Sequence, residues 1–238
     1  MLKLSCLFLA CAFLQVTFAS KIIDPLRDLP YTLFDPSLGA LCLDGTPAGY
    51  ASRQASKTSL VLQLPGGGWC FNGDMCLTRS NTSLGSSNSF KDQILTVGEG
   101  ELSGNATDNP HFYTFSAINP IYCDGGCFAG VKDDVVDGTN LYSRGRHNLE
   151  ATLDVVLDTW GFKDTLEEII VSGCSAGGLA TYLNVDHIHQ YVSARLTHTN
   201  GLKTRAFGNA GWFMDTNSLT WDGDAWSGVR ILNILLTF

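Results

Sequence analysis

Apolar residues fall into short runs and spaced sets that predict alternating strands and helices. Apolar runs bounded by Gly, Pro or polar residues predict strands at 59–64, 113–118, 169–171 and 203–207. Apolar positions at helical spacing predict a helix over 149–160, which Gly161 ends, and a second helix over 179–192. Residues 72–110 are rich in Asn, Ser, Gly and Asp and are expected to be a loop-heavy insertion. This alternation predicts the α/β class, with a parallel sheet and flanking helices.

The first nineteen residues differ from the rest. Lys3 is followed by a short apolar stretch over 4–16, and Thr17-Phe18-Ala19 places small residues where a signal peptidase cuts. The pattern predicts a secretory signal peptide at 1–19. The alternative is a buried N-terminal helix, which the absence of a helical polar face disfavours. No later segment of the sequence approaches transmembrane length.

Size and charge narrow the functional classes. The chain has 238 residues, 45% of them hydrophobic, which suffices for the core of one large domain. Its formal net charge of -8 argues against nucleic acid or an anionic membrane surface as partner.

Six of the eight cysteines remain after removal of the signal peptide, an even number that suits an oxidising compartment. Cys70 with Cys76, and Cys123 with Cys127, are close enough for local disulfides, whereas Cys174 either pairs elsewhere or stays free. Zinc is disfavoured because no second Cys or His pair at matching spacing accompanies 123–127, and no metal is expected. Sequons predict glycosylation at Asn81 and Asn105.

The most informative motif is Gly173-x-Ser175-x-Gly177, which lies between the predicted strand at 169–171 and the second predicted helix. A strand, a sharp turn carrying serine and then a helix form the nucleophile elbow of an α/β-hydrolase. The glycines fit that geometry, because bulky neighbours would clash with a strained turn that exposes the hydroxyl. The motif predicts Ser175 as a nucleophile.

An oxyanion hole is predicted where Gly66-Gly67-Gly68-Trp69 directly follows the strand at 59–64. In α/β-hydrolases a glycine-rich loop at this position supplies a backbone N–H to the tetrahedral intermediate, and the residue after the serine supplies another. The expected donors are the N–H groups of Gly68, Trp69 and Ala176. The alternative is an ordinary tight turn that needs glycine for positive φ.

Five spaced segments resemble the pectin acetylesterase/Notum family in sequence and order: 42–50, 67–72, 119–125, 173–178 and 211–215. The resemblance implies a secreted serine carboxylesterase with an α/β-hydrolase fold and no cofactor. It also implies that Ser175 is the nucleophile and that Gly68, Trp69 and Ala176 form the oxyanion hole. Trp69 and Phe213 would line the acyl pocket.

The sequence departs from the family pattern after Ser175. The triad order in this fold is Ser, Asp, His, and neither the acid nor the histidine is identified here. The histidines, none well placed for Ser175, are His111, His147, His187, His189 and His198. The expectation is that 20–238 form the N-terminal portion of an esterase domain that is incomplete at its C-terminus, in a truncated product or gene model.

The favoured function is removal of acetyl groups from pectin or a related polysaccharide, outside the cell or in a cell wall. One alternative is a Notum-like deacylase of a lipidated protein. The other is a non-catalytic secreted product or binding module, since a serine without its general base is a poor nucleophile. The oligomeric state is left open.

Overall fold

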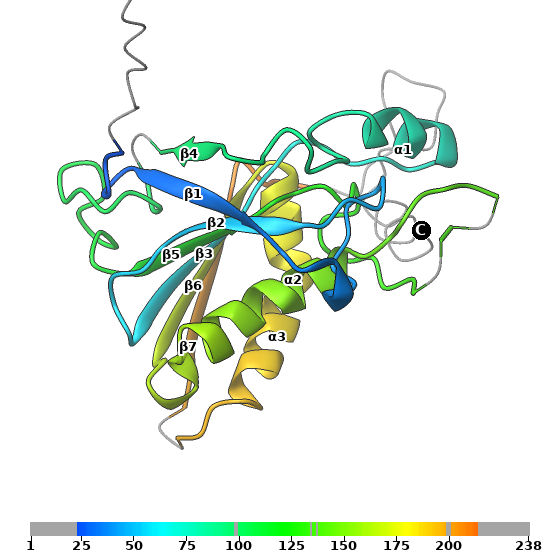
Figure 1. Cartoon of the computed structure of the whole chain (residues 1–238). Coiled ribbons are helices and arrows are strands. Elements are labelled where there is room, and N and C mark those ends of the chain that lie inside the picture. Colours follow the sequence, from blue (N-terminus) through cyan, green and yellow to red (C-terminus); the bar gives the residue numbers. More distant parts are fainter. Residues whose placement is uncertain (1–22, 98–99, 134, 137, 199–200, 214–238) are drawn as a thin grey trace, which may run out of the picture.

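The computed structural model describes residues 23–213, except 98–99, 134, 137 and 199–200, and within this part a seven-stranded sheet forms the centre (Figure 1). The strands are β1 (Asp28–Leu33), β2 (Gly49–Arg53), β3 (Ser59–Leu64), β4 (Ile94–Thr96), β5 (Ser116–Pro120), β6 (Glu168–Cys174) and β7 (Lys203–Asn209). The helices are α1 (Gly73–Ser80), α2 (Gly145–Asp154) and α3 (Ala176–Ser193), with short helical turns η1 (Pro36–Leu38), η2 (Val155–Thr159) and η3 (Phe162–Asp164).

The sheet has the order β4-β1-β2-β5-β3-β6-β7 and two halves of different character. Strands β5, β3, β6 and β7 run parallel to one another, whereas the pairs β4–β1, β1–β2 and β2–β5 are antiparallel. The predicted parallel α/β sheet is therefore confirmed for the half that carries the serine motif. The antiparallel half makes the sheet mixed and was not predicted.

Side chains alternate across the central strands, so the sheet has two buried faces. Leu60, Leu62 and Leu64 of β3 point to one face, where they join residues of α2 and α3 in the largest core cluster. Val61 points to the other face, which is covered by apolar side chains from the segment 95–115. These covering residues are Leu95, Val97, Leu102, Phe112 and Phe115. The predicted flanking helices thus lie on one face, and a largely irregular segment covers the other.

Most predicted elements are present with shifted ends. The strand at 59–64 is β3, the strand at 169–171 lies within β6, and the second helix is α3. The helix expected over 149–160 begins earlier, as α2, and continues through η2 until Gly161 takes the left-handed φ of 73°. The insertion at 72–110 contains α1 and β4 within its loops. The predicted signal peptide at 1–19 lies outside the described residues.

Two disulfides occur among the described cysteines. Cys70 pairs with Cys76, as predicted. The local pair at 123–127 is wrong, because Cys123 bonds to Cys42 across 81 residues and Cys127 is a buried free thiol. The N–H of Leu43 donates to the carbonyl of Cys123 at 2.9 Å. This bond holds Cys42 beside Cys123, and the Cα atoms of the two cysteines are 4.8 Å apart.

Candidate active site

Ser175 lies in a strained turn between β6 and α3. Its φ of 58° and ψ of -123° are values that residues with a Cβ rarely adopt. Backbone hydrogen bonds hold the turn: Ser175 N–H donates to the Asn209 carbonyl at 3.0 Å, and its own carbonyl accepts from Gly178 N–H at 2.8 Å. Ser175 is exposed at the carboxyl end of the parallel strands, where α/β proteins place their ligand sites.

Close backbone packing explains the glycines around the serine. A Cβ at Gly173 would lie 2.1 Å from the carbonyl oxygen of Gly177, and a Cβ at Gly177 would lie 2.0 Å from that of Leu64. Gly66 is equally confined, since a Cβ there would meet the Cys174 carbonyl oxygen at 2.3 Å and Ser175 Cβ at 3.4 Å. These contacts press the turn directly against the end of β3.

The glycine-rich loop after β3 lies beside the serine because β3 and β6 are parallel neighbours. Leu64, the last residue of β3, is in register with Gly173 of β6. Gly67 and Gly68 have φ values of 137° and 65°, which favour glycine. The topology therefore brings this loop and Ser175 together, as the motif order predicts.

The third predicted donor belongs to α3. Ala176 is buried and is the first residue of this 18-residue helix, immediately after Ser175. The N–H groups of a helix's first turn have no partner within the helix, and the helix dipole places partial positive charge there. This end of α3 suits a developing negative charge beside the serine.

The predicted pocket aromatics are also brought together. The rings of Trp69 and Phe213 meet edge to face with centroids 6.2 Å apart. Trp69 follows the glycine loop and Phe213 lies after β7, so the pair joins two strand ends. Gly211, two residues before Phe213, packs against Gly178 of α3.

The histidines are engaged away from Ser175. His147 contacts Asp133 at 3.1 Å, and His187 contacts Glu150 at 2.9 Å. His189 shares a hydrogen bond of 2.9 Å with the Thr204 hydroxyl, and His198 bonds the Leu166 carbonyl at 3.0 Å. His111 packs beside Phe112. In the described part of the chain, each of the five histidines thus contacts a group other than Ser175.

Two residues that the sequence did not single out hold the glycine loop. Arg79, on α1, donates through Nη1 to the Gly67 carbonyl at 2.9 Å and through Nη2 to the Gly68 carbonyl at 3.3 Å. The Tyr122 hydroxyl, just after β5, donates to the same Gly68 carbonyl at 2.6 Å. Contacts from side chain to backbone leave no local sequence pattern, so neither role could be found from the sequence.

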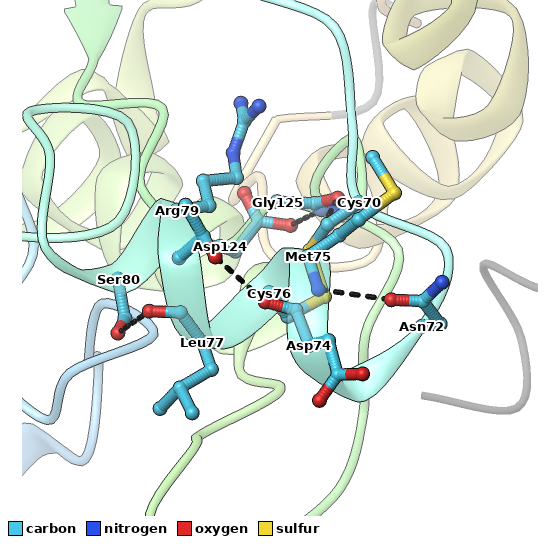
Figure 2. Close-up of a disulfide and its surroundings, with 12 residues drawn as sticks. Cys70, Asn72, Asp74, Met75, Cys76, Leu77, Arg79, Ser80, Asp124 and Gly125 are labelled. Carbon is cyan, nitrogen blue, oxygen red and sulfur yellow. Dashed lines mark hydrogen bonds between the residues drawn. A yellow bond between two sulfur atoms is a disulfide. The ribbon is translucent and has the colours of Figure 1, made fainter.

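Figure 2 shows how the Cys70–Cys76 disulfide connects this loop to α1. Cys70 follows Trp69 directly, and its N–H donates to the Gly125 carbonyl at 3.0 Å. Asn72 caps the helix by accepting from Met75 N–H at 2.9 Å. The helix that carries Arg79 is thereby fixed at its beginning to the end of the glycine loop.

A buried polar cluster lies beneath the loop. Burial raises the pKa of Asp124 to about 6, although its Oδ2 accepts from the N–H groups of Gly126 and Phe128 at 3.0 Å each. Burial also raises the pKa of the Cys127 thiol to about 12 and holds that of Tyr122 well above its ordinary range. The Tyr122 hydroxyl is therefore a protonated donor throughout the physiological pH range.

A cavity of about 410 Å³ opens beside the turn. Gly66 and Cys174, both next to Ser175, line this cavity together with Tyr31, Phe90 and other apolar side chains. Its polar end consists of Gln63, Glu101 and Asn119, which hydrogen-bond in series: Asn119 donates to Gln63 at 2.8 Å and Gln63 to Glu101 at 3.1 Å. The cavity offers both apolar contact and hydrogen-bonding groups near the serine.

Three further features bear on the sequence analysis: the glycosylation sequons, the length of apolar helices and the grouping of metal-ligating side chains. Asn81 is exposed at the end of α1 and Asn105 is half-buried in a turn, so glycosylation at both stays a prediction. Within the described part of the chain, no helix is both long and apolar enough to cross a bilayer. Among the same residues, no three His, Cys, Asp or Glu side chains are grouped to hold a metal ion.

The family model for pectinacetylesterase matches residues 27–226 of this chain. The chain belongs to the pectinacetylesterase family. Pectin acetylesterase 5 of Arabidopsis thaliana is 37% identical over 158 residues, which cover 65% of this chain and 36% of the relative. Pectin acetylesterase 11 of the same plant is 30% identical over 211 residues, 87% of this chain and 51% of the relative.

An animal branch of the family is similar too. Palmitoleoyl-protein carboxylesterase notum1a of Danio rerio is 31% identical over 176 residues, which cover 73% of this chain and 34% of the relative. The resemblance to the pectin acetylesterase/Notum family is confirmed by these matches. The chain spans about one third to one half of the length of the curated relatives it matches.

Proposed function

We propose that the protein is a serine carboxylesterase that hydrolyses acyl esters through Ser175. The observation that carries this proposal is the strained turn, in which Ser175 takes a φ of 58° between β6 and α3, directly against the glycine loop. Strain at one residue, held by close contacts between backbones, is typical of a site where a side chain must be presented to a reactant. Membership of a family whose members are named as esterases supports the same reaction class.

In the proposed reaction, Ser175 Oγ forms a bond to the ester carbonyl carbon as its proton passes to a general base. The negative charge on the carbonyl oxygen is stabilised by the N–H groups of Gly68, Trp69 and Ala176. Collapse of this intermediate expels the alcohol, which takes up the proton and leaves an acyl-serine. Water then attacks the acyl group in the reverse sense, releasing the carboxylic acid and restoring the serine. We assign the general base to no residue of this chain, because its histidines are engaged elsewhere.

The proposed substrate is an acetylated polysaccharide, with pectin or a related polymer in first place. The edge-to-face pair of Trp69 and Phe213 offers an apolar contact for the acyl group. The neighbouring cavity, with its hydrogen-bonding end at Gln63, Glu101 and Asn119, offers polar partners for a sugar ring. The plant relatives named pectin acetylesterases favour acetyl as the acyl group that is transferred to Ser175 and released as acetate. The palmitoleoyl-protein carboxylesterases keep a long acyl chain as the alternative.

The site of action is proposed to be outside the cell, including the cell wall. Two disulfides in the described part support an oxidising compartment, as does the predicted signal peptide at 1–19. Glycosylation at Asn81 and Asn105 would follow from that route.

The test uses p-nitrophenyl esters of acetate and of a long-chain acid, with protein expressed from its complete coding sequence. Ser175→Ala should abolish hydrolysis without lowering the melting temperature, whereas Ser59→Ala, at the far end of β3, should keep the wild-type rate. A preference for acetate supports the polysaccharide acetylesterase, and a preference for the long chain supports the protein deacylase. Wild-type protein that hydrolyses neither ester above background would support a non-catalytic binding module, which the engaged histidines favour. Equal rates above background in wild type and Ser175→Ala would show that Ser175 is not the nucleophile.

A further inference from the structure

The carbonyl groups of the glycine loop are held from one side by Arg79 and Tyr122. Arg79 donates to the carbonyls of both Gly67 and Gly68, and the Tyr122 hydroxyl donates to that of Gly68 at 2.6 Å. The Arg79 guanidinium also lies 5.2 Å from the centre of the Tyr122 ring, so the two side chains pack as one unit. We call this unit the carbonyl clamp.

The direction of these carbonyls fixes the direction of two amide groups. In a planar trans peptide the C=O and the following N–H point to opposite sides, and the described chain contains no cis peptide bond. Holding the Gly67 carbonyl therefore directs the Gly68 N–H away from the clamp. Holding the Gly68 carbonyl does the same for the Trp69 N–H.

The order of the strands in the sheet indicates which residues lie on the side toward which these N–H groups point. Strand β3 lies between β5 and β6, and the glycine loop follows β3. Tyr122 follows β5, on one side of the loop, and Ser175 follows β6, on the other. The loop lies directly beside the serine, because a Cβ built on Gly66 would be 3.4 Å from Ser175 Cβ. The carbonyls thus face the β5 side, and the amide groups face the side of the serine.

Such a loop needs external support. Gly67 and Gly68 both have positive φ, and glycine has more accessible backbone conformations than any other residue. Rotation of either peptide plane would turn its N–H away from the serine. A Cβ built on Gly68 would meet no atom within 4 Å, so nothing packs against the loop at that point. The clamp supplies the hydrogen bonds that oppose this rotation.

We propose that Arg79 and Tyr122 are positioning residues that aim the N–H groups of Gly68 and Trp69 at the oxyanion of the ester reaction. The proposal rests on the proposed function of Ser175. A guanidinium presents several N–H donors in one planar fork, so the single side chain of Arg79 can hold both carbonyls at once. These hydrogen bonds also polarise the two peptide units and make their N–H groups better donors.

The test compares Arg79→Gln and Tyr122→Phe with wild type in the protein expressed from its complete coding sequence. Arg53→Gln and Tyr50→Phe are matched controls, because both residues are half-buried and lie on β2 away from the loop. Two quantities are measured: kcat and KM for p-nitrophenyl acetate, and the ¹⁵N order parameters of Gly68 and Trp69. Arg79→Lys, which keeps one charged donor, serves as the conservative variant.

We expect kcat to fall about 10- to 100-fold in both clamp variants while KM changes less than about threefold, because loss of one oxyanion donor costs roughly 100- to 1,000-fold. The order parameters should fall from about 0.85 toward about 0.6. Arg79→Lys should be intermediate, and the controls should match wild type. A purely structural role would instead lower the melting temperature and leave kcat per folded molecule unchanged.

Folded clamp variants with wild-type kcat and rigid amides would overturn the proposal. If wild type is as inactive as Ser175→Ala, the proposed function fails, and only the order parameters then test the carbonyl clamp. Lower order parameters of Gly68 and Trp69 in the clamp variants would support the view that the clamp holds these two peptides. Unchanged order parameters would refute it.

Discussion

Replacing the buried carboxyl of Asp124 by an amide should change how stability depends on pH. The residue is 4% exposed, and burial raises its pKa from 3.8 to about 6. Its Oδ2 accepts two backbone N–H bonds, whereas Oδ1 has no hydrogen-bond partner among the described residues. An Asn side chain can keep both accepted bonds through its carbonyl oxygen while losing the buried charge.

The sign follows from proton linkage. Because the folded state binds this proton more tightly than the unfolded state, the group's stabilising contribution is complete below pH 3.8 and is lost as pH rises through about 6. A shift of about two units corresponds to roughly 3 kcal/mol, at about 1.4 kcal/mol per unit. Wild type should therefore lose up to ~3 kcal/mol relative to Asp124→Asn between pH 4 and pH 7.5.

Urea unfolding across this pH range, followed by the linear extrapolation to water, measures the difference. Other carboxyl groups affect both proteins equally and cancel. Asp186→Asn, on the exposed surface of α3, controls for removal of one negative charge. A difference between wild type and Asp124→Asn that stays flat with pH, or that grows in the opposite direction, would refute the reasoning.

Three further outcomes are expected. Gly177→Ala should destabilise the protein by several kcal/mol, because its Cβ would lie 2.0 Å from the Leu64 carbonyl oxygen. Gly73→Ala should be tolerated, since a Cβ there would meet no atom within 4 Å, and comparable melting temperatures of the two variants would argue against the packed turn. Removing the Cys70–Cys76 disulfide by a double change to Ser should cost ~2 kcal/mol in unfolding free energy, and no loss under non-reducing conditions would argue against the bond. Iodoacetamide should alkylate the exposed Cys174 in the native protein but spare buried Cys127, because burial raises the pKa of the Cys127 thiol to about 12. Peptide mass mapping that finds Cys127 alkylated and Cys174 unmodified would contradict this expectation.

The elements predicted from the sequence are those whose signal is local. The apolar run of β3 reflects burial on both faces of the sheet, and the helical spacing in α3 reflects burial along one side of that helix. Strands β1 and β2 were missed because their residues alternate irregularly between buried and exposed in the antiparallel half of the sheet. Their pairing depends on neighbours distant in sequence, which a local pattern does not encode.

The same distinction applies to the site. Ser175 and the glycine loop were found because strained turns and close approaches of backbone demand glycine at fixed spacings. The partners of that loop were not found, since Arg79 and Tyr122 act on backbone carbonyls that any residue possesses. The Cys42–Cys123 disulfide was missed for a related reason: proximity in sequence favoured 123–127, whereas the fold brings together residues 81 positions apart.

Covalent labelling with a fluorophosphonate tests most directly whether Ser175 is an activated nucleophile. The protein expressed from its complete coding sequence is incubated with the reagent, and the modified residue is located by peptide mass spectrometry. We predict a single phosphonyl group on the Ser175 hydroxyl, and none in Ser175→Ala. A folded wild-type protein that remains unlabelled, or that carries the label on another residue, would contradict the assignment.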